Sequence, residues 1–68
     1  PGFIDTEMTR NLLSKDEIKK LSSQIPLKRL GNTEDIANAI IFLVSDLNNF
    51  INGHSLVVDG GFLSAVNV

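Results

Sequence analysis

The stretch Glu34-Asp35-Ile36-Ala37-Asn38-Ala39-Ile40-Ile41-Phe42-Leu43-Val44 decides the fold, because it predicts a helix that is apolar around most of its circumference. Asn32 stands before it as an N-cap, and Asp35 occupies the N3 position. The pattern ends at Ser45-Asp46. Such a helix must be covered on several sides, and a chain of 68 residues has too little other sequence to do this. Residues 32–46 are therefore expected to form a long buried helix whose partners lie outside this chain.

Other elements are expected on both sides of this helix. The sequence Ser14-Lys15-Asp16-Glu17 fits a capping box, so residues 14–24 are expected to form an amphipathic helix that Pro26 ends. A short helix is expected over residues 6–13. Leu56-Val57-Val58 is a continuous apolar run, which is typical of a strand covered on both faces in a parallel sheet. One strand cannot form a sheet, so we expect missing sequence to supply its neighbours.

The composition is that of a globular protein and not of a disordered one, with 43% hydrophobic residues and a net charge of −2. It contains no cysteine and a single histidine, His54, which excludes disulfides and argues against a structural zinc site. Basic and acidic residues are interspersed, so nucleic acid and anionic membranes are not expected partners. The longest apolar run, Ala39 to Val44, is far shorter than the ~20 residues of a membrane span. The opening on Pro1-Gly2 suggests a fragment of a longer protein.

Four blocks of the sequence, in order and at suitable spacing across residues 1–61, resemble the C-terminal part of classical short-chain dehydrogenases/reductases. The blocks are Pro1-Gly2-Phe3-Ile4-Asp5-Thr6, Ile25-Pro26-Leu27-Lys28-Arg29-Leu30-Gly31, Glu34 to Asp46, and Ile51-Asn52-Gly53-His54-Ser55-Leu56-Val57-Val58-Asp59-Gly60-Gly61. Within the family, the segment Pro1 to Thr9 is most similar to the 3-oxoacyl-acyl-carrier-protein reductases of fatty-acid synthesis.

This resemblance implies an α/β fold, in which the chain forms the C-terminal part of a doubly wound parallel-sheet (Rossmann) domain. It would contribute short substrate-loop helices, one long buried helix and one final parallel strand. Residues 1–31 would hold the nicotinamide loop and the substrate loop, and residues 32–61 the last helix and the last strand. The tail, 62–68, carries no diagnostic residue.

The resemblance also implies an NAD(P)-dependent oxidoreductase that moves a hydride between nicotinamide and a carbonyl or alcohol. The catalytic Tyr-x-x-x-Lys pair, Ser and Asn of the family lie upstream of the Pro-Gly turn, and this chain contains no tyrosine, so we expect no catalytic residue in it. The choice between NADH and NADPH is left open. Two alternatives remain: another member of the family, acting on a sugar, polyol or steroid, or a non-catalytic helical oligomerisation module. The Pro-Gly start and the expected strand argue against the module.

By the same resemblance, the first residues would bind the cofactor. Pro1 and Gly2 would pass the nicotinamide ring, with the small Gly2 permitting close approach. The backbone N–H of Ile4 would bond the carboxamide oxygen, and the Thr6 hydroxyl would bond the carboxamide amine. The alternative for Thr6 is an ordinary helix N-cap.

Phe3 and Met8 are expected in a mobile substrate loop, with Met8 either contacting an acyl chain or packing in the ordinary way. Lys28 and Arg29 would either meet an acidic acyl-carrier protein or form a solvated connection, and the second is favoured. Asp59-Gly60-Gly61 is interpreted as a sharp turn without chemistry, and His54 as structural. No metal site is expected.

The partners implied by the resemblance are the missing N-terminal part of the same protein and further copies of it. A homotetramer would form through the helix of residues 32–46 and the strand of residues 55–59, since self-complementary contacts about two-fold axes are the usual route to homo-oligomers. The expected location is the cytoplasm.

Overall fold

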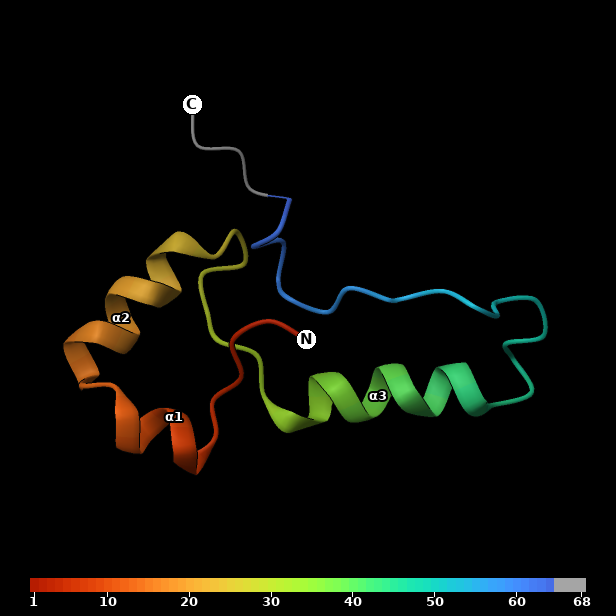
Figure 1. Cartoon of the computed structure of the whole chain (residues 1–68), viewed down its shortest axis with the longest axis horizontal. Coiled ribbons are helices and arrows are strands. Elements are labelled where there is room, and N and C mark those ends of the chain that lie inside the picture. Colours follow the sequence, from red (N-terminus) through yellow and green to blue (C-terminus); the bar gives the residue numbers. More distant parts are fainter. Residues whose placement is uncertain (65–68) are drawn as a thin grey trace.

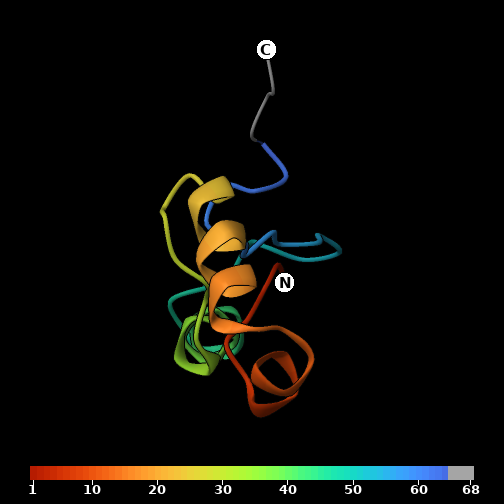
Figure 2. The ribbon, with the colours of Figure 1, turned by 90° about the vertical axis from the view of Figure 1, so that its left-hand side faces the viewer.

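The computed structural model describes residues 1–64 and shows three helices joined by long non-helical segments (Figure 1). The helices are α1, Glu7–Leu12, α2, Lys15–Gln24, and α3, Thr33–Val44. The molecule is flat, with extents of 42 × 32 × 16 Å. Seen from the end that carries α1 and α2, α3 lies nearly end-on behind them (Figure 2). Three non-helical segments meet between α3 and the pair α1 and α2. They are the N-terminal segment, the connection between α2 and α3, and residues 58–61.

The sequence correctly predicted where the helices begin. Ser14 Oγ accepts a hydrogen bond from Glu17 N at 3.1 Å, and Glu17 Oε1 accepts one from Ser14 N at 2.9 Å, so the capping box of α2 is confirmed. Asn32 and Asp35 form the same reciprocal pair at the start of α3, at 2.9 and 2.8 Å. These bonds satisfy backbone N–H groups that the first turn of a helix leaves free.

The expected strand at residues 55–59 does not form, and residues 1–64 contain no strand longer than an isolated bridge. The segment runs beside α3 without a neighbouring strand, and the bond between its Val58 oxygen and Gly2 N, 3.0 Å, joins it to the N-terminal segment. The single bridge is parallel and joins Ile4 to Gly31. A strand requires a ladder of bonds to a neighbour, and nothing among the described residues supplies one here.

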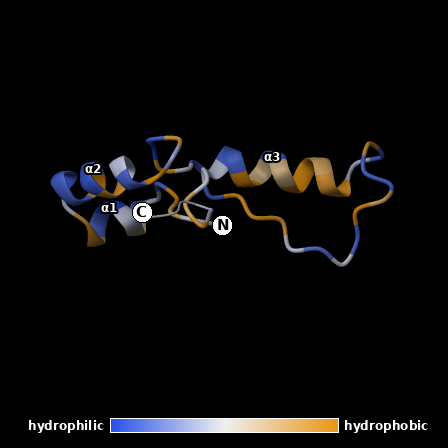
Figure 3. Ribbon diagram, turned by 90° about the horizontal axis from the view of Figure 1, so that it is seen from above, coloured by the Kyte–Doolittle hydropathy of each residue, from blue (hydrophilic) through white to orange (hydrophobic). Residues whose placement is uncertain are grey.

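The described residues bury no residue of α3, so the expected burial of this helix by partners outside the chain stays a prediction. Ile41 is 61% exposed and Val44 is 79% exposed. The extended segment that contains Leu56 and Val58 runs beside the hydrophobic helix α3 (Figure 3), and Pro1 lies on the same side. The apolar side chains of α3 nevertheless stay largely exposed. The physical reason is the one that the composition indicated: the described residues form too thin a layer to enclose a helix that is apolar on several sides.

The one buried side chain of residues 1–64 is Ile25, which is 1% exposed and lies directly after α2. Gly60 lies against it, so close that a Cβ on Gly60 would be 2.9 Å from Ile25 Cγ2. The backbone of Leu27 donates to the Gly60 oxygen at 3.2 Å. Ile25 therefore anchors the connection between α2 and α3 to the far end of the chain.

The Asp59-Gly60-Gly61 segment forms the predicted turn, with positive φ angles of 66° at Gly60 and 94° at Gly61. The Asp59 carboxylate accepts hydrogen bonds from the backbone N–H groups of Gly61 and Leu63, both at 2.8 Å. These bonds, the one from Leu63 first, lower the pKa of Asp59. Of the predicted tail, 62–68, residues 65–68 lie outside the described residues.

Candidate functional site

The segment predicted to bind nicotinamide, residues 1–6, is fixed by backbone bonds to two other parts of the chain. Gly2 N donates to the oxygen of Val58 at 3.0 Å. On either side of Ile4, Gly31 N donates to the Phe3 oxygen at 2.9 Å, and Asp5 N donates to the Gly31 oxygen at 2.7 Å. Hydrogen bonds within the chain therefore fix the path of this segment without a ligand.

The backbone groups of Ile4 point away from this bridge, because successive residues of an extended chain direct their N–H and C=O groups to opposite sides. The Ile4 oxygen accepts a hydrogen bond from Thr9 Oγ1 at 2.7 Å. The Ile4 N–H donates to no acceptor within the part of the chain that the structure describes. The half-buried Ile4 thus presents one donor that is available to a ligand.

Thr6 is the N-cap of α1, which is the alternative that the sequence offered to a cofactor contact. Its Oγ1 accepts from Thr9 N at 3.3 Å and lies 3.2 Å from Thr9 Oγ1. A hydroxyl has one hydrogen and two acceptor positions, so capping does not exhaust it. The sequence reasoning gave no role to Thr9, although a Thr three residues after an N-cap Thr was a visible signal that their side chains meet.

Gly2 is required by packing within the chain. A Cβ on Gly2 would lie 2.7 Å from Asp59 Cβ, closer than side-chain carbons approach one another. Pro1, Gly2 and Phe3 together line a shallow hollow with Leu56 and other residues of the C-terminal segment. The structure thus shows a close approach of Gly2 to Asp59, and the predicted approach to a nicotinamide ring stays a prediction.

The two residues assigned to the substrate loop are not brought together. The Phe3 ring packs edge-to-face on Phe62, with centroids 5.1 Å apart and planes at 89°. Met8 lies on α1 and is 71% exposed. The contact with Phe62 was missed because that residue stood in a tail without a recognisable motif.

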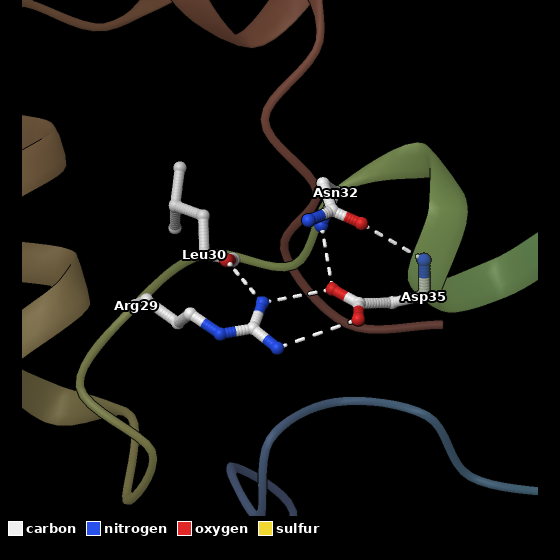
Figure 4. A network of polar contacts seen from close by, with 4 residues as sticks. All are labelled: Arg29, Leu30, Asn32 and Asp35. Atoms are coloured by element: carbon white, nitrogen blue, oxygen red, sulfur yellow. Dashed lines mark hydrogen bonds and ion pairs between the residues drawn. The ribbon is translucent and has the colours of Figure 1, made fainter.

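Arg29 lies on an exposed connection, as the favoured interpretation expected, but its charge is paired. Its guanidinium binds both carboxylate oxygens of Asp35, at 2.8 and 3.3 Å, and also donates to the Leu30 oxygen at 3.0 Å (Figure 4). The hydrogen bond from Arg29 lowers the pKa of Asp35, with a further contribution from the Asn32 N–H, and the same pair raises the pKa of Arg29. This network surrounds Gly31, whose backbone holds Phe3 and Asp5.

The second cation of the connection, Lys28, has a left-handed backbone with φ of 62°. Its Nζ donates to the oxygen of Ser23 at 2.8 Å, at the end of α2. A small cavity of about 170 Å³ lies between the connection, the N-terminal segment and the glycine turn, and Ile4, Arg29 and Gly60 are among the residues that line it.

Replacing Asp35 by alanine is expected to lower the melting temperature of the complete protein more than replacing Glu17 by alanine. Both residues occupy the N3 position of a capping box, but only Asp35 also holds a bidentate arginine. Thermal unfolding followed by circular dichroism measures the difference. In a background of Arg29→Ala the excess should disappear, and equal losses from the two single variants would contradict the role of the ion pair.

Two kinds of feature are absent from residues 1–64. No helix among them is long and apolar enough to cross a membrane. Nor do these residues hold a cluster of three or more His, Cys, Asp or Glu side chains placed to bind a metal ion.

Comparison with known proteins identifies the family. Residues 1–63 match the family model described as enoyl-(acyl carrier protein) reductase. The 3-oxoacyl-acyl-carrier-protein reductases of Buchnera aphidicola and Escherichia coli (strain K12) are each 49% identical over 61 residues, which is 90% of this chain and 25% of each relative. An uncharacterised oxidoreductase of Escherichia coli (strain K12) is 42% identical over 64 residues, 93% of this chain and 24% of that protein. The chain thus spans about a quarter of the length of the curated relatives it matches.

Among the described residues, the apolar helix α3 is largely exposed and the extended run of residues 55–58 has no neighbouring strand. The family match implies a Rossmann fold. The chain belongs to the short-chain dehydrogenase/reductase family. Within the family it is similar to the 3-oxoacyl-acyl-carrier-protein reductases, as its first nine residues predicted.

Proposed function

We propose that this chain forms the nicotinamide-binding and substrate-loop part of an NAD(P)-dependent reductase that acts on 3-oxoacyl groups carried by acyl-carrier protein. The observation that carries the proposal is the pairing of an available donor, the Ile4 N–H, with an acceptor, the Thr6 oxygen, in one hydrogen-bonded unit. A carboxamide offers one oxygen acceptor and one NH₂ donor, and this unit is complementary to both. The similarity to two reductases of this name supports the substrate.

The residues present suit the nicotinamide carboxamide. Ile4 N–H would donate to its oxygen, and Thr6 Oγ1 would accept from its NH₂ with the acceptor position that capping leaves over. The bound nicotinamide supplies the hydride that passes to the carbonyl carbon of the substrate. Pro1 and Gly2 would flank the ring. Since the chain contains no tyrosine, the proton donor of the family would come from elsewhere in the complete protein.

The remaining parts of the chain take their proposed places from the same assignment. Residues 1–31 would form the nicotinamide and substrate loops, with Phe3 and Met8 facing the acyl chain. Residues 32–61 would form the last helix and the last strand, and residues 55–59 would gain a ladder when a neighbouring parallel strand is present. The exposed apolar surface of α3 supports a place between the sheet and a second subunit of a homotetramer.

The test is a chimeric reductase in which residues 1–61 of this chain replace the matching segment of the Escherichia coli reductase. We expect a cooperatively folded enzyme that oxidises NADH or NADPH in the presence of a 3-oxoacyl thioester. Absorbance at the nicotinamide band measures the rate, and both cofactors are tried. A graft that does not fold with the remainder of its 49%-identical relative, or that folds but is inactive with both cofactors, would overturn the proposal.

Thr6→Val in the chimeric reductase is expected to lower kcat/KM for the cofactor about threefold to tenfold, because a net hydrogen bond contributes ~0.5–1.5 kcal/mol. Loss of the α1 cap accompanies it, so Asn32→Ala, which removes the cap of α3 outside the proposed nicotinamide and substrate loops, serves as the matched control. Asn32→Ala should lower the melting temperature while leaving kcat/KM unchanged. Thr6→Ser, which keeps the hydroxyl, should retain most of the activity. Equal kcat/KM values for Thr6→Val and the unmodified chimera would rule out the cofactor contact.

A further inference from the structure

The hydroxyl groups of Thr6 and Thr9 form a chain with a fixed direction. Thr9 Oγ1 lies 2.7 Å from the backbone oxygen of Ile4, and a carbonyl only accepts, so the single hydroxyl hydrogen of Thr9 is committed to Ile4. The two hydroxyl oxygens are 3.2 Å apart. Since Thr9 has no second hydrogen to give, Thr6 must donate to Thr9. The order is therefore Thr6 to Thr9 to Ile4.

This direction determines what Thr6 can offer to a ligand. Its hydrogen points to Thr9, and one acceptor position receives the Thr9 N–H at 3.3 Å. What remains on Thr6 is an acceptor position and no donor. Without the Thr9 hydroxyl, the Thr6 hydroxyl would be free to rotate and to donate its hydrogen to a ligand as readily as it accepts one.

From this geometry we infer that Thr9 is a positioning and specificity-determining residue that makes Thr6 an obligate acceptor, so that the site selects an NH₂ group at that point of the nicotinamide. The inference rests on the proposed function. Thr9 does not need to touch the cofactor, since it acts through the Thr6 hydroxyl and the Ile4 carbonyl. The part-buried setting of both bonds protects the arrangement from competition by water.

The probe is the 3-acetylpyridine analogue of the cofactor, in which a methyl group replaces the carboxamide NH₂ and the carbonyl oxygen is kept. For each variant of the chimeric reductase, kcat/KM is measured with the natural cofactor and with the analogue. The value for the natural cofactor divided by the value for the analogue is then compared with the same ratio in the unmodified chimera. Both values come from one preparation, so the fraction of folded enzyme cancels from the ratio. A purely structural loss therefore does not change it.

Thr9→Val keeps the shape of the side chain and removes the hydroxyl, and we expect it to lower the ratio about threefold, part of the fall expected for Thr6→Val. Thr9→Ala should lower the ratio by a similar factor, and Thr9→Ser, which keeps the hydroxyl, should give the ratio of the unmodified chimera. The double variant Thr6→Val/Thr9→Val should lower the ratio no further than Thr6→Val alone. Asn32→Ala, which removes the cap of α3, should leave the ratio unchanged.

The outcomes separate the two proposals. If Thr6→Val lowers the ratio and both Thr9→Val and Thr9→Ala leave it unchanged, the role of Thr9 is overturned and the cofactor contact stands. If Thr6→Val also leaves the ratio unchanged, the contact between Thr6 and the carboxamide is itself wrong. A fall with Thr9→Val that Thr9→Ser does not restore would assign the effect to packing and would overturn the inference as well.

Discussion

Ile25→Ala is expected to destabilise the chimeric reductase by about 2–5 kcal/mol, the usual cost of truncating a buried isoleucine. Ile25 is 1% exposed and is the only buried side chain among residues 1–64. Truncation would leave a cavity between the end of α2, the connection to α3 and the glycine turn, since Gly60 and Leu27 lie at this junction. The free energy of unfolding, obtained from urea denaturation, measures the loss.

The series contains its own controls. Ile25→Val removes a single methylene group and should cost about 0.5–1.5 kcal/mol. Leu12→Ala removes a side chain of similar size that is 74% exposed on α1, and a surface substitution of this kind should change stability by about 0.5 kcal/mol or less. A cost of Ile25→Ala no greater than that of Leu12→Ala would show that Ile25 does not hold the connection in place.

Gly60→Ala should destabilise the chimeric reductase by about 2–5 kcal/mol, for two separable reasons. The φ angle of 66° lies in the left-handed region, where an L-residue with a Cβ is disfavoured by ~1–2 kcal/mol. The new Cβ would also lie 2.9 Å from Ile25 Cγ2, and relieving such overpacking costs ~1–3 kcal/mol. Urea denaturation again measures the change.

Gly53→Ala is the matched control, because Gly53 has the same φ angle of 66° and a Cβ added to it would meet no atom of the described residues within 4 Å. It should show the backbone cost alone. In Ile25→Ala/Gly60→Ala the clashing methyl group is gone, so the double variant should be less destabilised than the sum of the two single variants. Equal effects of Gly60→Ala and Gly53→Ala, or strict additivity in the double variant, would contradict the close contact.

The sequence alone determined the helices and how they start. Ser14 with Glu17, and Asn32 with Asp35, formed the capping boxes that their spacing predicted, because a cap involves residues only three positions apart. The same local reasoning placed the turn at Asp59-Gly60-Gly61. The family was also predictable, since four short blocks in order carry more information than any one of them, and the match over residues 1–63 confirms it.

Only the tertiary structure revealed the contacts between residues distant in the sequence. The bridge of Ile4 with Gly31, the packing of Phe3 on Phe62 and the approach of Gly2 to Asp59 join parts of the chain that no periodicity relates. The bonds of Thr9 and of Arg29 were also missed, although they join residues only three to six positions apart and the Thr6–Thr9 spacing was a visible signal.

The expected strand at residues 55–59 does not form, and α3 stays exposed, for a related reason. A strand and a buried helix each need a partner, and the described residues contain neither a neighbouring strand nor a second apolar layer. Sequence pattern therefore determined the local conformation and the family of this chain. Tertiary structure determined which backbone donor is left available, because the bridge beside Ile4 forms only when its segment meets that of Gly31. Local hydrogen bonds among Thr6, Thr9 and Ile4, three to five positions apart, determine which hydroxyl must accept.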